Sequence, residues 1–230
     1  MNIAIIPARG GSKRIPKKNI KIFHGRPIIY WPIIKAIESG LFDKIIVSTD
    51  DKKIGDIASK YGAEVPFMRP KRISNDFAGT TDVVIHAIKF FQNKNYELDK
   101  VCCFYPTSVF FTIDDLNSGF EALNEKKYKF SLSVTKFNYP IARSFELIER
   151  GGLKMLYPEN FNKRTQDLKD TYHDAAQFCW GKASSWLSRS KIFDKYTNPV
   201  VIPSWRTIDI DDLDDWYMAE YLFDYLKNKR

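Results

Sequence analysis

The residues most suited to chemistry in this sequence form a run of cations and glycines directly after the first apolar segment. Within the segment PARGGSKRIPKKN (7–19), five cations fall in ten positions: Arg9, Lys13, Arg14, Lys17 and Lys18. Glycine lets the backbone approach a ligand closely, and successive N–H groups in such a loop bind anionic oxygens. Neither GxxxxGK[ST] nor GxGxxG is present, so the loop is neither a Walker A motif nor the dinucleotide fingerprint. It predicts a phosphate site of another kind, with a solvated basic turn or a nucleic-acid patch as alternatives.

A second group of reactive residues is the acidic string IDIDD near the C-terminus. Asp209 and Asp211 alternate along the chain, so an extended backbone would place both carboxylates on one face. Mg²⁺ binds one or two carboxylates together with substrate phosphates and water. We therefore expect Asp209 and Asp211 to be metal ligands, and Asp212, Asp214 and Asp215 to cap and solvate the final helix. The alternative is that Asp211 and Asp212 only cap that helix.

The hydrophobic pattern predicts the elements that position these loops. Strands are expected at 2–8, 44–50, 63–69 and 101–105, and helices at 27–40, 51–61, 80–92 and 112–125. This alternation predicts βαβ units in an α/β fold, a three-layer sandwich around a mainly parallel sheet. Ligands of such sheets bind beyond the carboxyl ends of the strands, where the basic loop falls. Pro32 is expected to shorten or kink the first helix.

The rhythm changes between about residues 129 and 175, where no helix separates the apolar runs. Two β-like runs, 143–148 and 153–157, flank Gly151-Gly152 and predict an antiparallel hairpin insertion. The later elements expected are strands at 177–183, 200–203 and 207–210 and a helix at 212–227. The whole chain, 1–230, is expected to form one domain that contains this insertion.

Composition narrows the class of protein. The 230 residues include 36 Lys and Arg against 28 Asp and Glu, a formal net charge of +8, and 44% are hydrophobic, which excludes a disordered chain. No apolar run approaches the roughly 20 residues that span a bilayer. The N-terminal charges follow a short apolar run, unlike those of a secretory signal. Three cysteines, two of them adjacent, favour reduced thiols and a cytoplasmic location.

The basic loop resembles the nucleotide-binding signature of the cytidylyltransferases that activate acidic sugars, the CMP-sialic acid synthetase family. Further motifs follow in the family's order: VSTDD (47–51), RP (69–70), ND…TT (75–81), YPTS (105–108), RTQD (164–167) and IDID (208–211). The resemblance extends from residue 3 to about 215. The string RTQDLKDTYHDAAQF, followed by WGKA, is more similar to the pseudaminic acid branch than to the sialic acid branch. Sialic acid enzymes typically carry a sugar-contacting glutamine where this sequence has Tyr105.

The resemblance implies a fold similar to nucleotide-diphospho-sugar transferases, which are Rossmann-like, and a reaction of CTP with a nine-carbon 2-keto sugar acid. Pseudaminic acid is the expected substrate, Mg²⁺ the cofactor, and CMP-sugar and pyrophosphate the products. The product would serve glycosylation of bacterial surface structures or flagellin. The family also implies a homodimer in which the insertion at about 129–175 reaches the partner's site. Neither nucleic acid nor membrane is expected as a partner.

The resemblance also implies roles for individual residues. The catalytic candidates are Arg9, Lys13, Lys18, Asp209 and Asp211, the last two also being the metal ligands. The nucleotide-binding candidates are Ala8, Arg9, Gly10, Gly11, Ser12, Lys13, Lys18, Asn19, Arg69, Thr80 and Thr81. The sugar-binding candidates are Tyr105, Thr107, Ser108, Arg164, Gln166, Tyr172 and His173.

Several of these assignments have alternatives. Arg69 could be a surface charge rather than a cytosine contact, and Thr80 could be the N-cap of the following helix. Asp50 could contact a sugar hydroxyl or order the basic loop. His173, oriented by Asp174, could act as a general base rather than as a binding or structural residue.

For the whole chain, CMP-legionaminic or CMP-N-acetylneuraminic acid synthesis is the alternative within the class. A basic nucleic-acid-binding module is the alternative outside it. That module is disfavoured because the cations cluster at a strand end rather than along a helix, and because Asp209 and Asp211 would repel phosphate.

Overall fold

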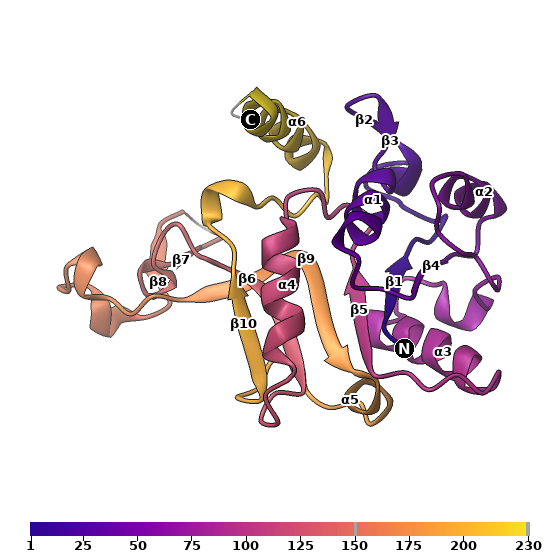
Figure 1. The fold of residues 1–230 in the computed structure, drawn as a ribbon. Coiled ribbons are helices and arrows are strands. Elements are labelled where there is room, and N and C mark those ends of the chain that lie inside the picture. Colours follow the sequence, from indigo (N-terminus) through magenta and orange to yellow (C-terminus); the bar gives the residue numbers. More distant parts are fainter. Residues whose placement is uncertain (150, 229–230) are drawn as a thin grey trace.

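The computed structural model describes residues 1–149 and 151–228. At its centre lies a six-stranded sheet with the strand order β10-β6-β9-β5-β1-β4 (Figure 1). Its strands are β1 (Ile3–Pro7), β4 (Lys44–Ser48), β5 (Lys100–Phe104), β6 (Phe130–Lys136), β9 (Tyr172–Lys182) and β10 (Thr197–Val201). β1 runs parallel to β4 and β5, and β10 runs parallel to β6. β9 alone is antiparallel to both of its neighbours. The mainly parallel sheet predicted from the sequence is confirmed.

Helices cover both faces of this sheet. They are α1 (Tyr30–Ser39), α2 (Lys52–Lys60), α3 (Thr80–Gln92), α4 (Ile113–Ala122), α5 (Ala183–Leu187) and α6 (Leu213–Asn228). Alternate residues of β1 enter different cores: Ala4 and Ile6 pack with α1, α2 and α4, whereas Ile3 and Ile5 pack with α3 and α5. Because every side chain of this strand must be buried, its sequence is continuously apolar. The predicted three-layer sandwich is confirmed, and no helix in the described part of the chain is long and apolar enough to cross a bilayer.

Pro32 does not kink the first long helix. It is the third residue of α1, which begins at Tyr30 and ends before Gly40. The N–H groups of a first helical turn have no partner inside the helix, so proline costs little there. The predicted shortening is thus correct, and the helix starts three residues later than expected.

Two of the predicted strands are absent from the sheet, and a third begins earlier than expected. Residues 63–69 make only isolated bridges to the β4 side, Ile46–Glu64 and Thr49–Met68, because Pro66 cannot donate to a ladder. Residues 207–210 are irregular, and the predicted run 200–203 overlaps only the end of β10. β9 begins at Tyr172 rather than at residue 177, since its polar first residues pair with the end of β6.

Shorter elements complete the fold. A small hairpin, β2 (Ile22–Phe23) and β3 (Arg26–Pro27), precedes α1. The 3₁₀ turns are η1 (Lys18–Ile20), η2 (Lys71–Ile73), η3 (Ile141–Arg143), η4 (Pro158–Asn160), η5 (Thr165–Asp167) and η6 (Ser204–Arg206).

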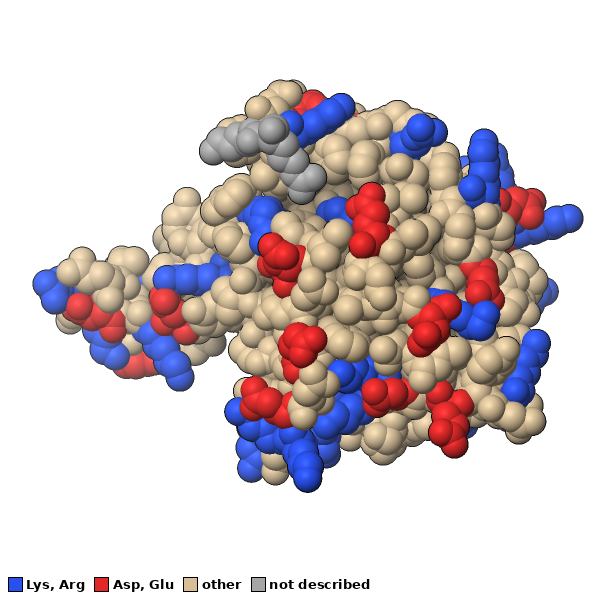
Figure 2. Space-filling view, viewed as in Figure 1, with Lys and Arg blue, Asp and Glu red and all other residues tan. Residues whose placement is uncertain are grey.

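The segment between β6 and β9 forms a lobe that projects from the body of the molecule (Figures 1 and 2). Its hairpin, β7 (Phe145–Leu147) paired with β8 (Leu153–Met155), confirms the predicted antiparallel runs with tighter bounds. Large apolar side chains on the lobe face solvent: Leu147 is 81% exposed, Phe161 68% and Leu153 61%. These side chains of the lobe therefore do not enter the core of their own chain.

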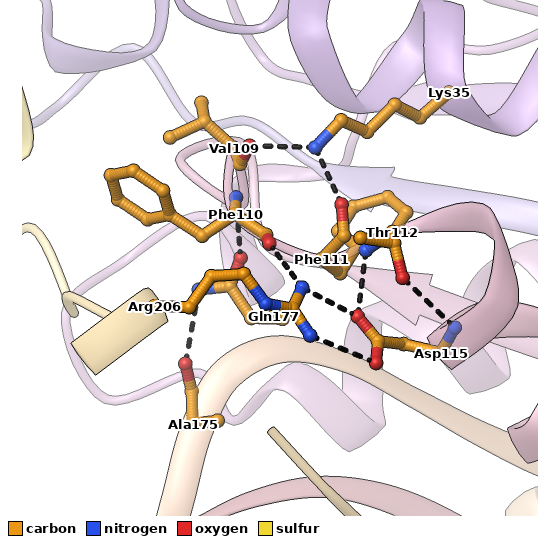
Figure 3. A network of polar contacts seen from close by, with 9 residues as sticks. All are labelled: Lys35, Val109, Phe110, Phe111, Thr112, Asp115, Ala175, Gln177 and Arg206. Atoms are coloured by element: carbon orange, nitrogen blue, oxygen red, sulfur yellow. Dashed lines mark hydrogen bonds and ion pairs between the residues drawn. The ribbon is translucent and has the colours of Figure 1, made fainter. Parts of the chain in front are cut away.

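A polar network fixes the loop between β5 and α4 (Figure 3). Arg206 of η6 donates through Nη1 to Asp115 Oδ2 at 2.7 Å and through Nη2 to Asp115 Oδ1 at 3.1 Å. Arg206 Nη1 also donates to the Phe110 carbonyl at 2.8 Å, and the Phe110 N–H donates to Gln177 Oε1 at 3.0 Å. Asp115 completes a capping box with Thr112 at the start of α4. The ion pair therefore joins η6 to α4, and the hydrogen bond between Phe110 and Gln177 connects the same loop to β9.

Arg206→Met is expected to lower the free energy of unfolding by about 3 kcal/mol, because it leaves the carboxylate of Asp115 without its charged partner in a site where each side chain is under 15% exposed. Urea unfolding measures this effect. The matched control is Lys127→Met, which breaks a pair with Glu125 whose side chains are 62% and 58% exposed. That control should leave the free energy of unfolding almost unchanged, because exposed ion pairs contribute little to stability, and equal losses in the two variants would contradict the structural role of Arg206.

Candidate active site

The basic loop starts where β1 ends and is tied to its surroundings on both sides. The Ala8 N–H donates to the Ser48 carbonyl at 2.9 Å, which places the loop beside the end of β4. The Gly10 N–H donates to Asp50 Oδ1 at 2.9 Å, and Asn19 Nδ2 donates to the Arg9 carbonyl at 2.9 Å. Asp50 therefore orders the basic loop, as one of its two predicted roles required.

The two glycines of the loop, Gly10 and Gly11, differ in how closely their surroundings approach them. A Cβ atom on Gly10 would lie 2.9 Å from both Cβ and Oδ2 of Asp51, the residue that caps α2. Any side chain at position 10 would therefore push the loop away from α2. A Cβ atom on Gly11 would meet nothing within 4 Å, so packing does not require glycine there.

A cavity of about 440 Å³ opens above the loop. The predicted site residues that line it come from four separate segments: Arg9, Ser12, Lys13, Lys18, Asn19, Thr80, Tyr105, Thr107, Asp209 and Asp211. Arg14 lines it as well. The fold thus brings together the cations and the two carboxylates that the sequence separates by about 190 positions.

Cations hold the acidic string in place. Lys18 Nζ donates to the Ile210 carbonyl at 2.6 Å and lies 3.4 Å from Asp211 Oδ1. Arg14 Nη2 lies 2.8 Å from the same oxygen. Asp209 keeps contact with solvent, but the surrounding protein desolvates its carboxylate and Asp211 repels it, and both effects raise the pKa of Asp209 above its usual range.

This donor set fits Mg²⁺ better than an ion that needs a complete protein cage. The described residues contain no group of three or more His, Cys, Asp or Glu side chains that could hold a metal. Mg²⁺ needs only one or two carboxylates when phosphates and water supply the other ligands. A cation between Asp209 and Asp211 would also relieve the repulsion that raises the pKa of Asp209.

The neighbouring aspartates start the final helix, as predicted. Asp212 Oδ1 accepts the N–H groups of Asp214 and Asp215 at 3.0 Å each. Asp215 Oδ2 accepts the N–H groups of Asp211 and Asp212 in return. The carboxylate of Asp211 instead faces Arg14 and Lys18, so the alternative in which Asp211 serves only as a cap is wrong.

A second cavity of about 210 Å³ adjoins the first and shares Pro7, Arg9 and Thr80 with it. Arg69 lines this cavity and is only 6% exposed, so the surface-charge alternative is wrong. Its Nε donates to Ser48 Oγ at 3.2 Å, its Nη2 donates to the Ser48 carbonyl, and burial lowers the pKa of Arg69 to about 10. Thr80 is the first residue of α3, and Gly79 occupies the N-cap position, so the capping alternative is wrong as well. Thr81 lines neither cavity.

Three of the four residues of the YPTS motif at the end of β5 line the main cavity, Pro106 among them. Tyr105 and Thr107 line it, and burial raises the pKa of the Tyr105 hydroxyl. Ser108 is fully buried and donates through Oγ to the Tyr105 carbonyl at 2.6 Å, which makes it a structural residue of this turn. Its predicted contact with the sugar does not occur in this cavity.

The four remaining sugar candidates lie in or beside the projecting lobe, outside both cavities. Gln166 lines a third cavity of about 390 Å³ at the base of the lobe, and Tyr172 is the first residue of β9. Arg164 is paired with Asp167, with Nε to Oδ2 at 2.7 Å. Within one chain, these residues do not join the nucleotide candidates.

The predicted orientation of His173 by a carboxylate is not observed. His173 Nδ1 is 2.8 Å from the backbone carbonyl of Asp174, whereas the Asp174 carboxylate accepts the N–H of Ala176 at 2.8 Å. The ring of His173 packs against Phe137 with the centroids 4.5 Å apart. These contacts describe a packed strand residue rather than an oriented base.

Sequence reasoning missed one residue at the heart of the site. Asp76 carries its carboxylate between Arg9 Nη1 and Lys13 Nζ, each 2.6 Å away. It belongs to the ND…TT motif, but the motif alone does not indicate that the carboxylate meets cations more than 60 positions earlier in the chain.

Comparison with known proteins identifies the class. A family model described as "Cytidylyltransferase" matches residues 3–203, so this chain belongs to the cytidylyltransferase family and is a nucleotidyltransferase. It is 41% identical over 222 residues to a pseudaminic acid cytidylyltransferase of Campylobacter jejuni, with 96% of each chain covered. It is 30% identical over 229 residues to a CMP-N,N'-diacetyllegionaminic acid synthase of Legionella pneumophila, again with 96% of each covered.

A solved structure supports the fold. A CMP-2-keto-3-deoxy-manno-octonic acid synthetase complexed with CTP aligns with a TM-score of 0.72 over 97% of this chain and 98% of that chain. The sequence identity is 14%, so the likeness concerns the architecture alone. It confirms the nucleotidyltransferase-like sandwich predicted from the sequence.

Lys18→Met is expected to slow pyrophosphate release from CTP by roughly 100-fold, because it removes the ammonium group that enters the cavity beside Asp211. The loss of its hydrogen bond to Ile210 should cost about 1 kcal/mol of stability, measured by urea unfolding. Lys17→Met is the control, since Lys17 is exposed and lies outside both cavities. Similar losses of activity in the two variants would show that Lys18 has no specific role.

Proposed function

We propose that this protein transfers CMP from CTP to the anomeric hydroxyl of pseudaminic acid or a closely related nine-carbon 2-keto sugar acid. The observation that best supports this proposal is that Arg9, Lys13 and Lys18 line the same cavity as Asp209 and Asp211. In the reaction, the sugar oxygen bonds to the α-phosphorus, the bond from that phosphorus to the β-phosphate oxygen breaks, and the hydroxyl loses its proton. The products are CMP-sugar and pyrophosphate.

The cations of the basic loop would bind the triphosphate. Arg9 can grip two phosphate oxygens at once through its planar guanidinium, whereas Lys13 and Lys18 act as point charges. Negative charge spreads over the phosphoryl oxygens during transfer, so fixed cations lower the barrier mainly by position and charge. Ser12 and Asn19 line the same cavity and add hydrogen-bonding groups.

Asp209 and Asp211 would hold Mg²⁺, which neutralises phosphate charge when it is bound. Three observations support this assignment: both carboxylates line the phosphate cavity, Lys18 contacts the backbone between them, and Asp209 is desolvated and repelled by Asp211. Without a bound metal ion, the two carboxylates would repel the triphosphate.

The smaller cavity would receive the cytosine base. Arg69 lines it with a guanidinium fixed on Ser48, and such a fixed donor can select among base edges. Arg9 and Thr80 border both cavities, so a nucleotide could extend from one into the other. The N–H groups of Ala8 and Gly10 already donate to Ser48 and Asp50, so these two residues would shape the loop, whereas Gly11 would contribute a backbone group to the nucleotide.

The sugar acid would bind near Tyr105 and Thr107, with the lobe of a second subunit completing the site. Arg164, Gln166, Tyr172 and His173 lie outside the main cavity of their own chain, so a homodimer gives them access to a partner's cavity. The exposed Leu147, Leu153 and Phe161 support this proposal, because solvent-exposed apolar surface of that extent is typical of an interface.

The alternatives carry less support. Legionaminic acid is the substrate named for a relative that is 30% identical, against 41% for the pseudaminic acid enzyme, and N-acylneuraminate enzymes are further relatives. Against the nucleic-acid alternative, Arg9, Lys13 and Arg14 of the loop are paired with the carboxylates of Asp76 and Asp211, whereas a nucleic-acid surface presents its cations unpaired.

A cytoplasmic location is proposed from the thiols. Cys102, Cys103 and Cys179 are buried and free, and burial raises the pKa of Cys103 to about 12. Such thiols stay protonated and suit a reducing compartment. The product would then serve glycosylation of bacterial surface structures or flagellin.

The activity test uses the full chain with CTP, Mg²⁺ and a panel of pseudaminic, legionaminic and N-acetylneuraminic acids. Pyrophosphate release should be fastest with pseudaminic acid and should stop when EDTA removes the metal. Asp209→Asn should lower kcat about 100-fold, whereas Asp214→Asn, at the exposed start of α6, should match the wild type. No release with any acid, together with salt-sensitive binding of DNA or RNA, would instead support the nucleic-acid alternative.

The dimer is tested by sedimentation equilibrium. The wild type should be a dimer, and Leu147→Asp should shift it to monomer because a carboxylate would enter the apolar contact. That variant should still bind CTP but lose activity toward the sugar acid. Ile22→Asp, which changes an exposed apolar residue of β2 outside the lobe, should stay dimeric. A monomeric wild type would contradict the proposal.

A further inference from the structure

Asp76 occupies a position that the proposed reaction does not explain. Its Oδ1 lies 2.6 Å from Arg9 Nη1, and its Oδ2 lies 2.6 Å from Lys13 Nζ. Both oxygens of one carboxylate are thus engaged by two of the cations that would bind the triphosphate. A carboxylate in this place resembles an anionic ligand more than a structural tie.

The segment that contains Asp76 has its own turn, which is formed without hydrogen bonds from the basic loop. It connects η2 to α3, and Asn75 Oδ1 shapes it by accepting the N–H groups of Phe77 and Ala78 at 2.9 Å each. Phe77 is 97% exposed at the tip of this turn. Asp76 also lines the smaller cavity next to Arg9, so its carboxylate borders the proposed nucleotide site directly.

The two ion pairs are accessible to solvent. The side chain of Asp76 is 42% exposed, that of Lys13 78% and that of Arg9 34%. Exposed pairs of this kind add little to the stability of a fold, so they can separate at small cost when another anion competes. The hydrogen bonds from Lys13 and Arg9 lower the pKa of Asp76, so the carboxylate is charged at neutral pH.

Charge counting shows the consequence. Arg9 and Lys13 carry two positive charges, and Asp76 reduces their sum to one. A triphosphate must displace the carboxylate or bind beside it, and the pyrophosphate product meets the same competitor. Weaker binding of a product is useful because its release frees the site for the next turnover.

The geometry points to Asp76 as a residue that competes with phosphate groups for Arg9 and Lys13 and so speeds the release of pyrophosphate. This inference rests on the proposed triphosphate site and deepens it. Asp76 acts through the two cations, and it tunes the affinity of the site for polyanions. Asp76 weakens the binding of CTP in the same way. The faster release of pyrophosphate therefore raises the turnover rate only when the CTP concentration is high enough to saturate the site.

The experiment compares Asp76→Asn with the wild type in the full-length protein. The variant keeps the shape of the side chain and removes its charge. The dissociation constant for CTP with Mg²⁺ and the inhibition constant for pyrophosphate should each fall about three- to tenfold, in the range expected when a nearby exposed charge is removed. Stopped-flow measurement should show slower dissociation of pyrophosphate, since affinity changes at one site act mainly on the dissociation rate.

Two further variants separate the local effect from other causes. Asp76→Glu keeps the charge and should stay within about twofold of the wild type in both constants, as expected if charge rather than exact shape matters. Asp194→Asn removes an exposed carboxylate outside both cavities and should leave both constants unchanged, which excludes an effect of net charge alone.

The failures are distinguishable. If the wild type binds no CTP, the proposed function is wrong. If the wild type binds CTP but Asp76→Asn binds CTP and pyrophosphate equally well or more weakly, the competition is wrong and Asp76 instead positions the two cations.

Discussion

The ion pair between Arg206 and Asp115 is the contact on which the geometry of the site depends. Taking two charges out of water is costly, and the cost is offset only when each group finds further partners. Here Asp115 also accepts the Thr112 N–H, and Arg206 also donates to the Phe110 carbonyl. Burial alone would raise the pKa of Asp115, but the hydrogen bonds that it accepts from Arg206 and Thr112 outweigh this effect and lower the pKa. The pair anchors the chain three residues before Asp209 to the loop that carries Tyr105 and Thr107. Asp209 and Asp211 therefore keep a fixed position relative to the cavity wall that Tyr105 and Thr107 form.

Within the cavity the charges are arranged as opposed pairs rather than as a uniform basic surface. Arg14 and Lys18 face Asp211, and Arg9 and Lys13 face Asp76. The net charge of +8 thus says little about the site itself, because half of the nearby positive charge is already answered by carboxylates. Preorganised cations of this kind need little rearrangement when a polyanion arrives. The same pairing explains why the loop is unlike a nucleic-acid surface, which presents its cations unpaired to phosphates along an exposed face.

The sequence was sufficient for features that depend on local pattern, and insufficient for those that depend on distant contacts. Continuous apolar runs identified β1, β4 and β5, and periodic ones identified α2, α3 and α4, because burial on one or both faces dictates those patterns. Pro66 stopped a run of the same composition from joining the sheet, and Gly79 took the cap position that Thr80 was expected to fill. The motifs placed Arg9, Lys18, Asp209 and Asp211 in one cavity correctly. Asp76 and Arg206 were missed because their partners lie 67 and 91 positions away. No local pattern records such pairs.

The residues assigned to the nucleotide and those assigned to the sugar acid lie in different parts of the fold, which the order of the motifs in the sequence does not indicate. Nucleotide candidates are built on the ends of parallel strands, where the sheet itself sets their distances. Four of the candidates for the sugar acid instead lie in or beside the projecting lobe, on which the large apolar side chains of Leu147, Leu153 and Phe161 are exposed. Exposing these apolar side chains to water is unfavourable. A second copy of the chain would remove this unfavourable exposure by covering the lobe. In the proposed dimer, the same contact that buries the lobe would bring Arg164 and Gln166 to a partner's cavity. Assembly and sugar recognition would then depend on one surface, whereas nucleotide binding would depend on the single chain.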